Sequence, residues 1–95
     1  MIEEIKDINL LKDLFDKYKK DYNAIVNDYT FIYAYKLDNK YVSFVVAKIL
    51  YEQAEIIDIF TLEEYRKRGI AKELLNTIIN KKEEENITLE VNINN

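Results

Sequence analysis

Three apolar segments rich in aromatic and β-branched residues follow one another closely between residues 30 and 61. Each has the composition of a β-strand; they are TFIYAYKL at 30–37, YVSFVVAKILY at 41–51 and AEIIDIFT at 54–61. The residues DNK at 38–40 are a turn signal, so the first two segments predict a hairpin. The third segment follows after a very short connection, so we expect an antiparallel meander of three strands.

The N-terminal flank predicts one more strand and a helix. Residues 1–5, MIEEI, indicate a short strand. Asp7 is expected to cap a helix, because apolar residues recur at helical spacing from Leu10 to Tyr22.

The C-terminal flank predicts a helix followed by a strand. An apolar stripe at helical spacing begins directly after Gly69 and runs from Ile70 to Ile79, with Asn86 as the expected C-terminal cap. Residues 87–93, ITLEVNI, alternate strictly between apolar and polar residues, which is typical of a strand. Strand, helix and strand across 54–93 predict a parallel βαβ unit. The expected order is therefore β-α-β-β-β-α-β, a mixed α/β sheet.

Composition excludes several classes of function. The chain has 95 residues, which predicts a single domain over 1–95. It has no cysteine and no histidine, so we expect no disulfide, no thiolate nucleophile and no metal site. The net charge of −4 argues against nucleic acid as a partner. No membrane-length apolar run and no signal peptide are found, so the expected location is the cytoplasm, with no membrane partner.

Three cations stand directly before the only glycine of the chain, at the start of the second predicted helix. They are Arg66, Lys67 and Arg68, followed by Gly69. A helix N-terminus carries unpaired N–H groups and partial positive charge, so cations there are disfavoured unless an anion binds. Glycine lets a phosphate approach the backbone closely. The pattern indicates a phosphate site, and a solvated basic loop with Gly69 as a turn residue is the alternative.

This segment carries a resemblance to a known family. Arg66 to Ala71, RKRGIA, resembles the Arg/Gln-x-x-Gly-x-Gly/Ala signature of the GNAT family of N-acetyltransferases, in which the signature also follows a strand and opens a helix. ITLEVNINN at 87–95 is similar to the next strand of the ribosomal-protein-alanine acetyltransferase type. The resemblance implies the acyl-CoA N-acyltransferase fold, and it implies acetyl-CoA as co-substrate.

The resemblance also implies a set of contacts with the coenzyme. The backbone of residues 67–72 would bind the pyrophosphate, while residues 59–61 and 89–91 would frame the pantetheine and thioester from two splayed strands. The residues expected to bind the coenzyme are Ile59, Phe60, Thr61, Arg66, Lys67, Arg68, Gly69, Ile70, Ala71, Lys72 and Asn95. A free backbone N–H near Phe60 is expected to stabilise the oxyanion.

The acetyl group would pass directly to an amine, so no enzyme nucleophile is needed. Without histidine, the general base must be a carboxylate, acting through water, or a tyrosine. By resemblance Glu90 is the first choice, and Asp58 is a second carboxylate in an otherwise apolar strand. The plain alternatives are that Glu90 is a solvated strand residue and that Asp58 pairs with a neighbouring cation.

The resemblance ends at Asn95, where the family continues with a helix that carries a tyrosine proton donor, and with one more strand. We therefore expect a GNAT domain that lacks this C-terminal segment. The expected function is acetyl transfer to an amine or peptide acceptor, with a protein N-terminus favoured. One alternative is a non-catalytic coenzyme-binding or dimerising module, and another is an interaction domain for an acidic partner. Residues 87–93 would leave an open sheet edge, which predicts a homodimer through the C-terminal strand.

Overall fold

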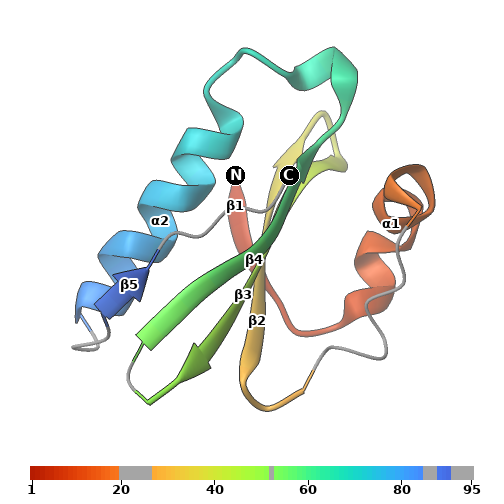
Figure 1. Ribbon diagram of the computed structural model, residues 1–95. Coiled ribbons are helices and arrows are strands. Elements are labelled where there is room, and N and C mark those ends of the chain that lie inside the picture. Colours follow the sequence, from red (N-terminus) through yellow and green to blue (C-terminus); the bar gives the residue numbers. More distant parts are fainter. Residues whose placement is uncertain (20–26, 52, 85–87, 91–95) are drawn as a thin grey trace.

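Figure 1 shows the computed structural model of the chain, which describes residues 1–19, 27–51, 53–84 and 88–90. The strands are β1 (Ile2–Ile5), β2 (Thr30–Leu37), β3 (Lys40–Leu50), β4 (Gln53–Thr61) and β5 (Thr88–Glu90). The α-helices are α1 (Lys12–Tyr18) and α2 (Ile70–Glu84), preceded by the 3-10 segments η1 (Ile8–Leu11) and η2 (Glu63–Tyr65). The order of strands and helices predicted from the sequence is confirmed.

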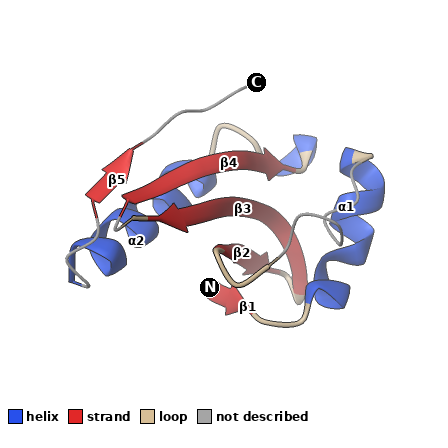
Figure 2. Cartoon of the chain, turned by 60° about the horizontal axis from the view of Figure 1, so that its bottom comes forward, coloured by secondary structure: helices blue, strands red, loops and turns tan. Residues whose placement is uncertain are grey.

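The strands form one mixed sheet in the order β1-β2-β3-β4-β5. Neighbours from β1 to β4 are antiparallel, which confirms the meander, and β4 and β5 are parallel, as expected for a βαβ unit. Figure 2 shows the strands side by side in this order, with β5 at one edge and β1 at the other. The last strand is described at 88–90 only; the rest of the strand predicted over 87–93, and the cap at Asn86, lie outside the described residues.

The turn between β2 and β3 follows the prediction for residues 38–40. Asp38 and Asn39 both have positive φ, 54° and 62°. Two such residues in succession make the two-residue hairpin turn whose twist matches that of the flanking strands, and Asp and Asn tolerate this conformation well. The turn therefore fixes the register in which β2 pairs with β3.

The first helix ends earlier than the sequence predicted. Asp7 does cap it, since its side chain accepts a hydrogen bond from the N–H of Asn9 at 3.0 Å. The helix begins as the 3-10 segment η1 and α1 then ends at Tyr18, because Lys19 turns to a left-handed φ of 61° and closes it. The prediction that the helix reaches Tyr22 is wrong in its end point, and Tyr22 itself lies outside the described residues.

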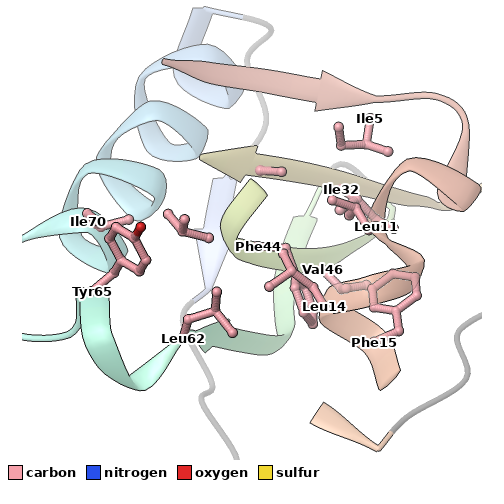
Figure 3. Packing of buried hydrophobic residues seen from close by; sticks show 12 residues of the cluster. Ile5, Leu11, Leu14, Phe15, Ile32, Phe44, Val46, Leu62, Tyr65 and Ile70 are labelled. Carbon is pink, nitrogen blue, oxygen red and sulfur yellow. The ribbon is translucent and has the colours of Figure 1, made fainter. Parts of the chain in front are cut away.

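The two helices cover opposite faces of the sheet, so the central strand β3 is buried on both sides. Phe44 and Val46 pack toward α1, whereas Val45 and Ala47 pack toward α2, and all four are fully buried. Figure 3 shows the cluster on the α1 side, where the labelled residues are Ile5, Leu11, Leu14, Phe15, Ile32, Phe44, Val46, Leu62, Tyr65 and Ile70. This buried central strand pairs with β4, and β4 carries part of the candidate site.

Candidate functional site

The candidate site begins at the loop that joins β4 to α2. Lys67 and Gly69 both have positive φ, 63° and 79°. The N–H of Glu73 donates to the carbonyl of Gly69 at 3.0 Å, which is the first hydrogen bond of the helix. The N–H groups of residues 70–72 therefore precede the helical ladder and point out from its start, where the partial positive charge of the helix gathers. Alternating backbone conformations of this kind form concave anion-binding loops.

Gly69 stands where a side chain would be strained and would project into open space. Its positive φ favours glycine, and a Cβ built on it would meet nothing within 4 Å. The space beside the backbone is thus open to a ligand. Gly69 fits both interpretations of the sequence, the phosphate site and the solvated basic loop. Its positive φ shapes the turn, and its missing side chain leaves room for a phosphate beside the backbone.

The three cations of the loop differ in what they contact. Arg66 donates from Nε to the carbonyl of Thr61 at 2.9 Å, and its guanidinium lies over the ring of Phe60 at 5.8 Å. Arg68 lies over the ring of Tyr65 at 5.1 Å, and Lys67 is exposed. Within the described part of the chain none of these cations is ion-paired with a carboxylate, the one such pair being Lys6 with Glu4. Their positive charge is therefore available to an anion.

Two adjoining hollows meet at this loop. One, of about 120 Å³, is lined by Thr61, Tyr65, Arg66, Lys67, Gly69, Ile70, Ala71 and Lys72. The other, of about 400 Å³, is lined by Tyr18, Ile59, Phe60, Thr61, Arg66 and Ala71. They share Thr61, Arg66 and Ala71, so the surface is continuous. Nine of the eleven residues that the sequence assigned to the coenzyme line these two hollows, and the tenth, Arg68, lies in the same loop without lining either of them. The eleventh, Asn95, lies outside the described residues.

The backbone of β4 presents polar groups to this hollow. The carbonyl of Phe60 accepts from the buried Oγ of Ser43 at 2.8 Å, so Phe60 directs its backbone groups toward β3. Successive residues of a strand alternate, so the backbone of Thr61 faces away from β3, which agrees with its carbonyl accepting from Arg66. The described pairing with β5 covers only residues 53–55. The N–H expected near Phe60 for an oxyanion is therefore best matched by Thr61.

Asp58 is buried, with 7% of its surface exposed, and it accepts two hydrogen bonds from described residues. Its Oδ1 accepts from the hydroxyl of Tyr18 at 2.7 Å and from the N–H of Ile59 at 2.9 Å. Burial raises the pKa of Tyr18 to about 12, and the hydrogen bond and negative charge of Asp58 add to this effect. Tyr18 is a site residue that the sequence reasoning missed, because it looked like one more packing residue on the first helix.

The backbone register of Glu90 places it at one end of β4, and the loop at 66–69 follows the other end. Its register partner is Glu55, and that of Leu89 is Ala54. Glu55 is four residues from Ile59, which is about 13 Å along a strand. Leu89 and Glu90 are therefore paired beside the beginning of β4, and Val91 lies outside the described residues.

Comparison with known proteins agrees with the fold. Residues 2–95 match the family described as the acetyltransferase (GNAT) family. The chain belongs to the GNAT family. A search of curated proteins finds no match to this GNAT sequence.

Solved structures share the same GNAT fold at low sequence identity. An acetyltransferase from Vibrio fischeri aligns at 19% identity with a TM-score of 0.77, covering 98% of this chain and 95% of that one. A ribosomal-protein-alanine N-acetyltransferase from Brucella melitensis aligns at 23% identity with a TM-score of 0.84, covering 99% and 79%. A putative streptothricin acetyltransferase from Bacillus anthracis, solved with acetyl coenzyme A, aligns at 28% identity with a TM-score of 0.63, covering 76% and 43%.

No helix within the described ranges is long and apolar enough to cross a bilayer. Among the same residues there is no cluster of three or more acidic ligands that could hold a metal ion.

Proposed function

We propose that this GNAT chain binds acetyl-CoA and transfers its acetyl group to an amine. The observation that carries the proposal is the loop at 66–69, where two left-handed residues and the open side of Gly69 adjoin the hollow lined by Ile59, Phe60 and Thr61 of β4. An anion-binding loop next to a hollow lined by a strand suits a ligand with a pyrophosphate at one end and amides at the other.

Each part of the coenzyme has a matching part of the site. The pyrophosphate would accept hydrogen bonds from the backbone of residues 67–72, with the charges of Arg66, Lys67 and Arg68 around it. The pantetheine would run along residues 59–61, as a further strand would, and Asn95 remains a proposed contact. The N–H of Thr61 would stabilise the oxyanion that forms when the amine attacks the thioester.

The acceptor we favour is the α-amino group of a protein N-terminus. Its pKa of about 8, against about 10.4 for lysine, means that it needs less help to lose a proton. The Brucella relative, which is named for acetylation of a ribosomal-protein alanine, supports this choice. Other structures of the same fold are named as aminoglycoside acetyltransferases, which keeps small amines as the second class of acceptor. We place the reaction in the cytoplasm, within one domain, and keep Glu90 as the sequence-based candidate for the base.

The competing function is that of a non-catalytic module that binds coenzyme A or dimerises. The Vibrio relative favours the catalytic function, since 95% of a chain named as an acetyltransferase is covered by this one. Turnover separates the two, because only the enzyme would consume acetyl-CoA in the presence of an amine.

Calorimetric titration with acetyl-CoA tests the proposal, with two cations compared. Arg68 and Lys81 each lie over a tyrosine ring, at 5.1 and 5.3 Å, but Lys81 is 12 residues beyond Gly69, about 18 Å along α2. Arg68→Ala should weaken binding several-fold and flatten its salt dependence, whereas Lys81→Ala should leave both near the parent values. Equal effects of the two substitutions, or no heat of binding in the parent, would contradict the proposed pyrophosphate site at residues 67–72.

A further inference from the structure

A buried carboxylate and a tyrosine beside the coenzyme hollow form a pair that coenzyme binding does not explain. Asp58 is 7% exposed, and its Oδ1 takes the hydroxyl hydrogen of Tyr18 at 2.7 Å. Tyr18 is the last residue of α1, whereas Asp58 lies 40 residues further on, in the middle of β4. The contact therefore depends on the tertiary fold.

An irregularity in β4 aims Asp58 at α1. Val46 is the register partner of Asp58 while Ala47 is that of Ile56, so Ile57 is an extra residue, a β-bulge. Ile56 and Ile59 consequently pack toward α2, although they are three residues apart and would otherwise face opposite ways. The bulge shifts the alternation by one residue, and Asp58 meets Tyr18 on the α1 side.

Tyr18 lies between Asp58 and the hollow. It lines the 400 Å³ hollow together with Ile59, Phe60 and Thr61, whereas Asp58 is not part of that lining. Its ring packs against Phe60 with centroids 4.7 Å apart, and the helix ends at the next residue. Of the two residues in the pair, Tyr18 is therefore the one that borders the hollow.

We propose that Tyr18 and Asp58 form a proton relay that receives the proton of the acceptor amine, with Tyr18 in contact with the amine and Asp58 as the final acceptor. The inference rests on the proposed function and deepens it, because it names the group that makes the amine nucleophilic. It gives to Asp58 the role that the sequence resemblance gave to Glu90.

The steps balance in protons and electrons. An alkylammonium gives a proton to the hydroxyl oxygen of Tyr18 while the hydroxyl proton passes to Oδ1 of Asp58, so an ammonium and a carboxylate become an amine and a carboxylic acid. The nitrogen lone pair then forms a bond to the thioester carbon and the C–S bond breaks. The second proton of the nitrogen goes to the departing thiolate, which gives the amide and free coenzyme A.

The pair has apolar neighbours on β3 and borders a hollow that is also lined by a cation. On β3 the residues beside Asp58 are Val46 and Phe44, which are apolar and fully buried. Arg66 is the charged residue that lines the same hollow as Tyr18. The raised pKa of Tyr18 keeps its hydroxyl protonated, so it passes a proton without becoming a tyrosinate at working pH.

The pH dependence of turnover, with Tyr18→Phe compared to the parent, tests the relay. Without the hydroxyl, the amine must lose its proton to solvent, so kcat at neutral pH should fall by about 10-fold for an α-amino acceptor and then recover as the pH rises past the acceptor's pKa of about 8. The Kd for acetyl-CoA should stay within about twofold, since the ring remains. Asp58→Asn should give the same pH profile; should that variant not fold, Tyr18→Phe carries the test.

Tyr41→Phe is the matched control. The hydroxyl of Tyr41 also donates to a carboxylate, that of Glu3 at 3.1 Å, and Tyr41 does not line either hollow of the site. A structural effect would appear equally in both tyrosine variants, as a lower melting temperature with an unshifted pH profile.

The outcomes distinguish a failure of the proton relay from a failure of the proposed acetyltransferase function. A parent that acetylates no amine overturns the transferase and the relay together. A parent that turns over, with Tyr18→Phe unchanged in kcat and pH profile, overturns the relay alone. A Glu90→Gln variant that loses more turnover than Asp58→Asn returns the base role to Glu90 and also overturns the relay.

Discussion

Gly69 combines two properties that substitutions can separate, a left-handed backbone and open space where a Cβ would stand. Gly69→Val should lose about 1–2 kcal/mol of stability through backbone strain and should also weaken acetyl-CoA binding strongly. Gly69→Asn should keep most of the stability, because asparagine tolerates positive φ, yet should still weaken binding through its side chain. Thermal unfolding and calorimetry on both variants measure the two effects. An asparagine variant with parent affinity would show that the ligand does not approach this side of the backbone.

The raised pKa of Tyr18 predicts how the free energy of unfolding changes at alkaline pH. Its folded pKa is raised from 10.0 to about 12, so its contribution to the free energy of unfolding is complete below about pH 10 and is lost as the pH rises through about 12. The pKa values of Tyr35 and Tyr41 are raised as well, through Glu73 for the first and chiefly through burial for the second. The parent should therefore lose stability over this window more steeply than Tyr18→Phe. Urea unfolding at both ends of the window checks this, and parallel curves would contradict it.

At the scale of elements, α2 is held to the sheet by a few buried side chains. Leu74 is fully buried against the β3 and β4 side chains of its face, whereas Leu10 of η1 is 54% exposed. Leu74→Ala should lower the free energy of unfolding by about 2–5 kcal/mol, and Leu10→Ala by far less. Urea unfolding measures both. Because α2 presents its N-terminus to the proposed ligand, Leu74→Ala should also weaken acetyl-CoA binding, and similar losses from the two leucines would contradict this account of the packing.

The same scale shows what the sequence can and cannot predict. The meander was predictable because its three segments are apolar, adjacent and separated by short connections, and the loop was predictable because Gly69 follows three cations. The bulge at Ile57 was not, since it depends on the register between β3 and β4 and leaves no local pattern. For that reason the sequence indicated Asp58 as a candidate base but did not indicate Tyr18 as its partner. The end of α1 was also missed, because a lysine at a left-handed position is no recognisable stop signal.

At the scale of the whole molecule, we expect two copies of the chain to associate through the C-terminal strand, beyond β4 in the sheet. Strand edges with free backbone groups pair with other chains, so we expect a two-fold dimer through the C-terminal strand. Sedimentation at micromolar concentration should show the dimer, and Leu89→Lys, in β5, should shift it toward monomer. Lys81→Ala, on the exposed side of α2, serves as the control. A monomer at all concentrations would end this proposal without affecting the coenzyme site.

The bulge in β4 also limits how such a chain can change by insertion or deletion. Removing one residue from a strand normally sends every later side chain to the opposite face. Here the loss of the single codon for Ile57 would do the reverse: Ile56, Asp58, Ile59 and Phe60 would keep the faces they now occupy, because regular alternation would replace the bulge. The bend that a bulge gives a strand would go with it, and the described pairing with β5 lies entirely before that bend. A one-residue deletion would therefore keep the alternation of the core and remove the bend, so the length of β4 shapes the site as its side chains do.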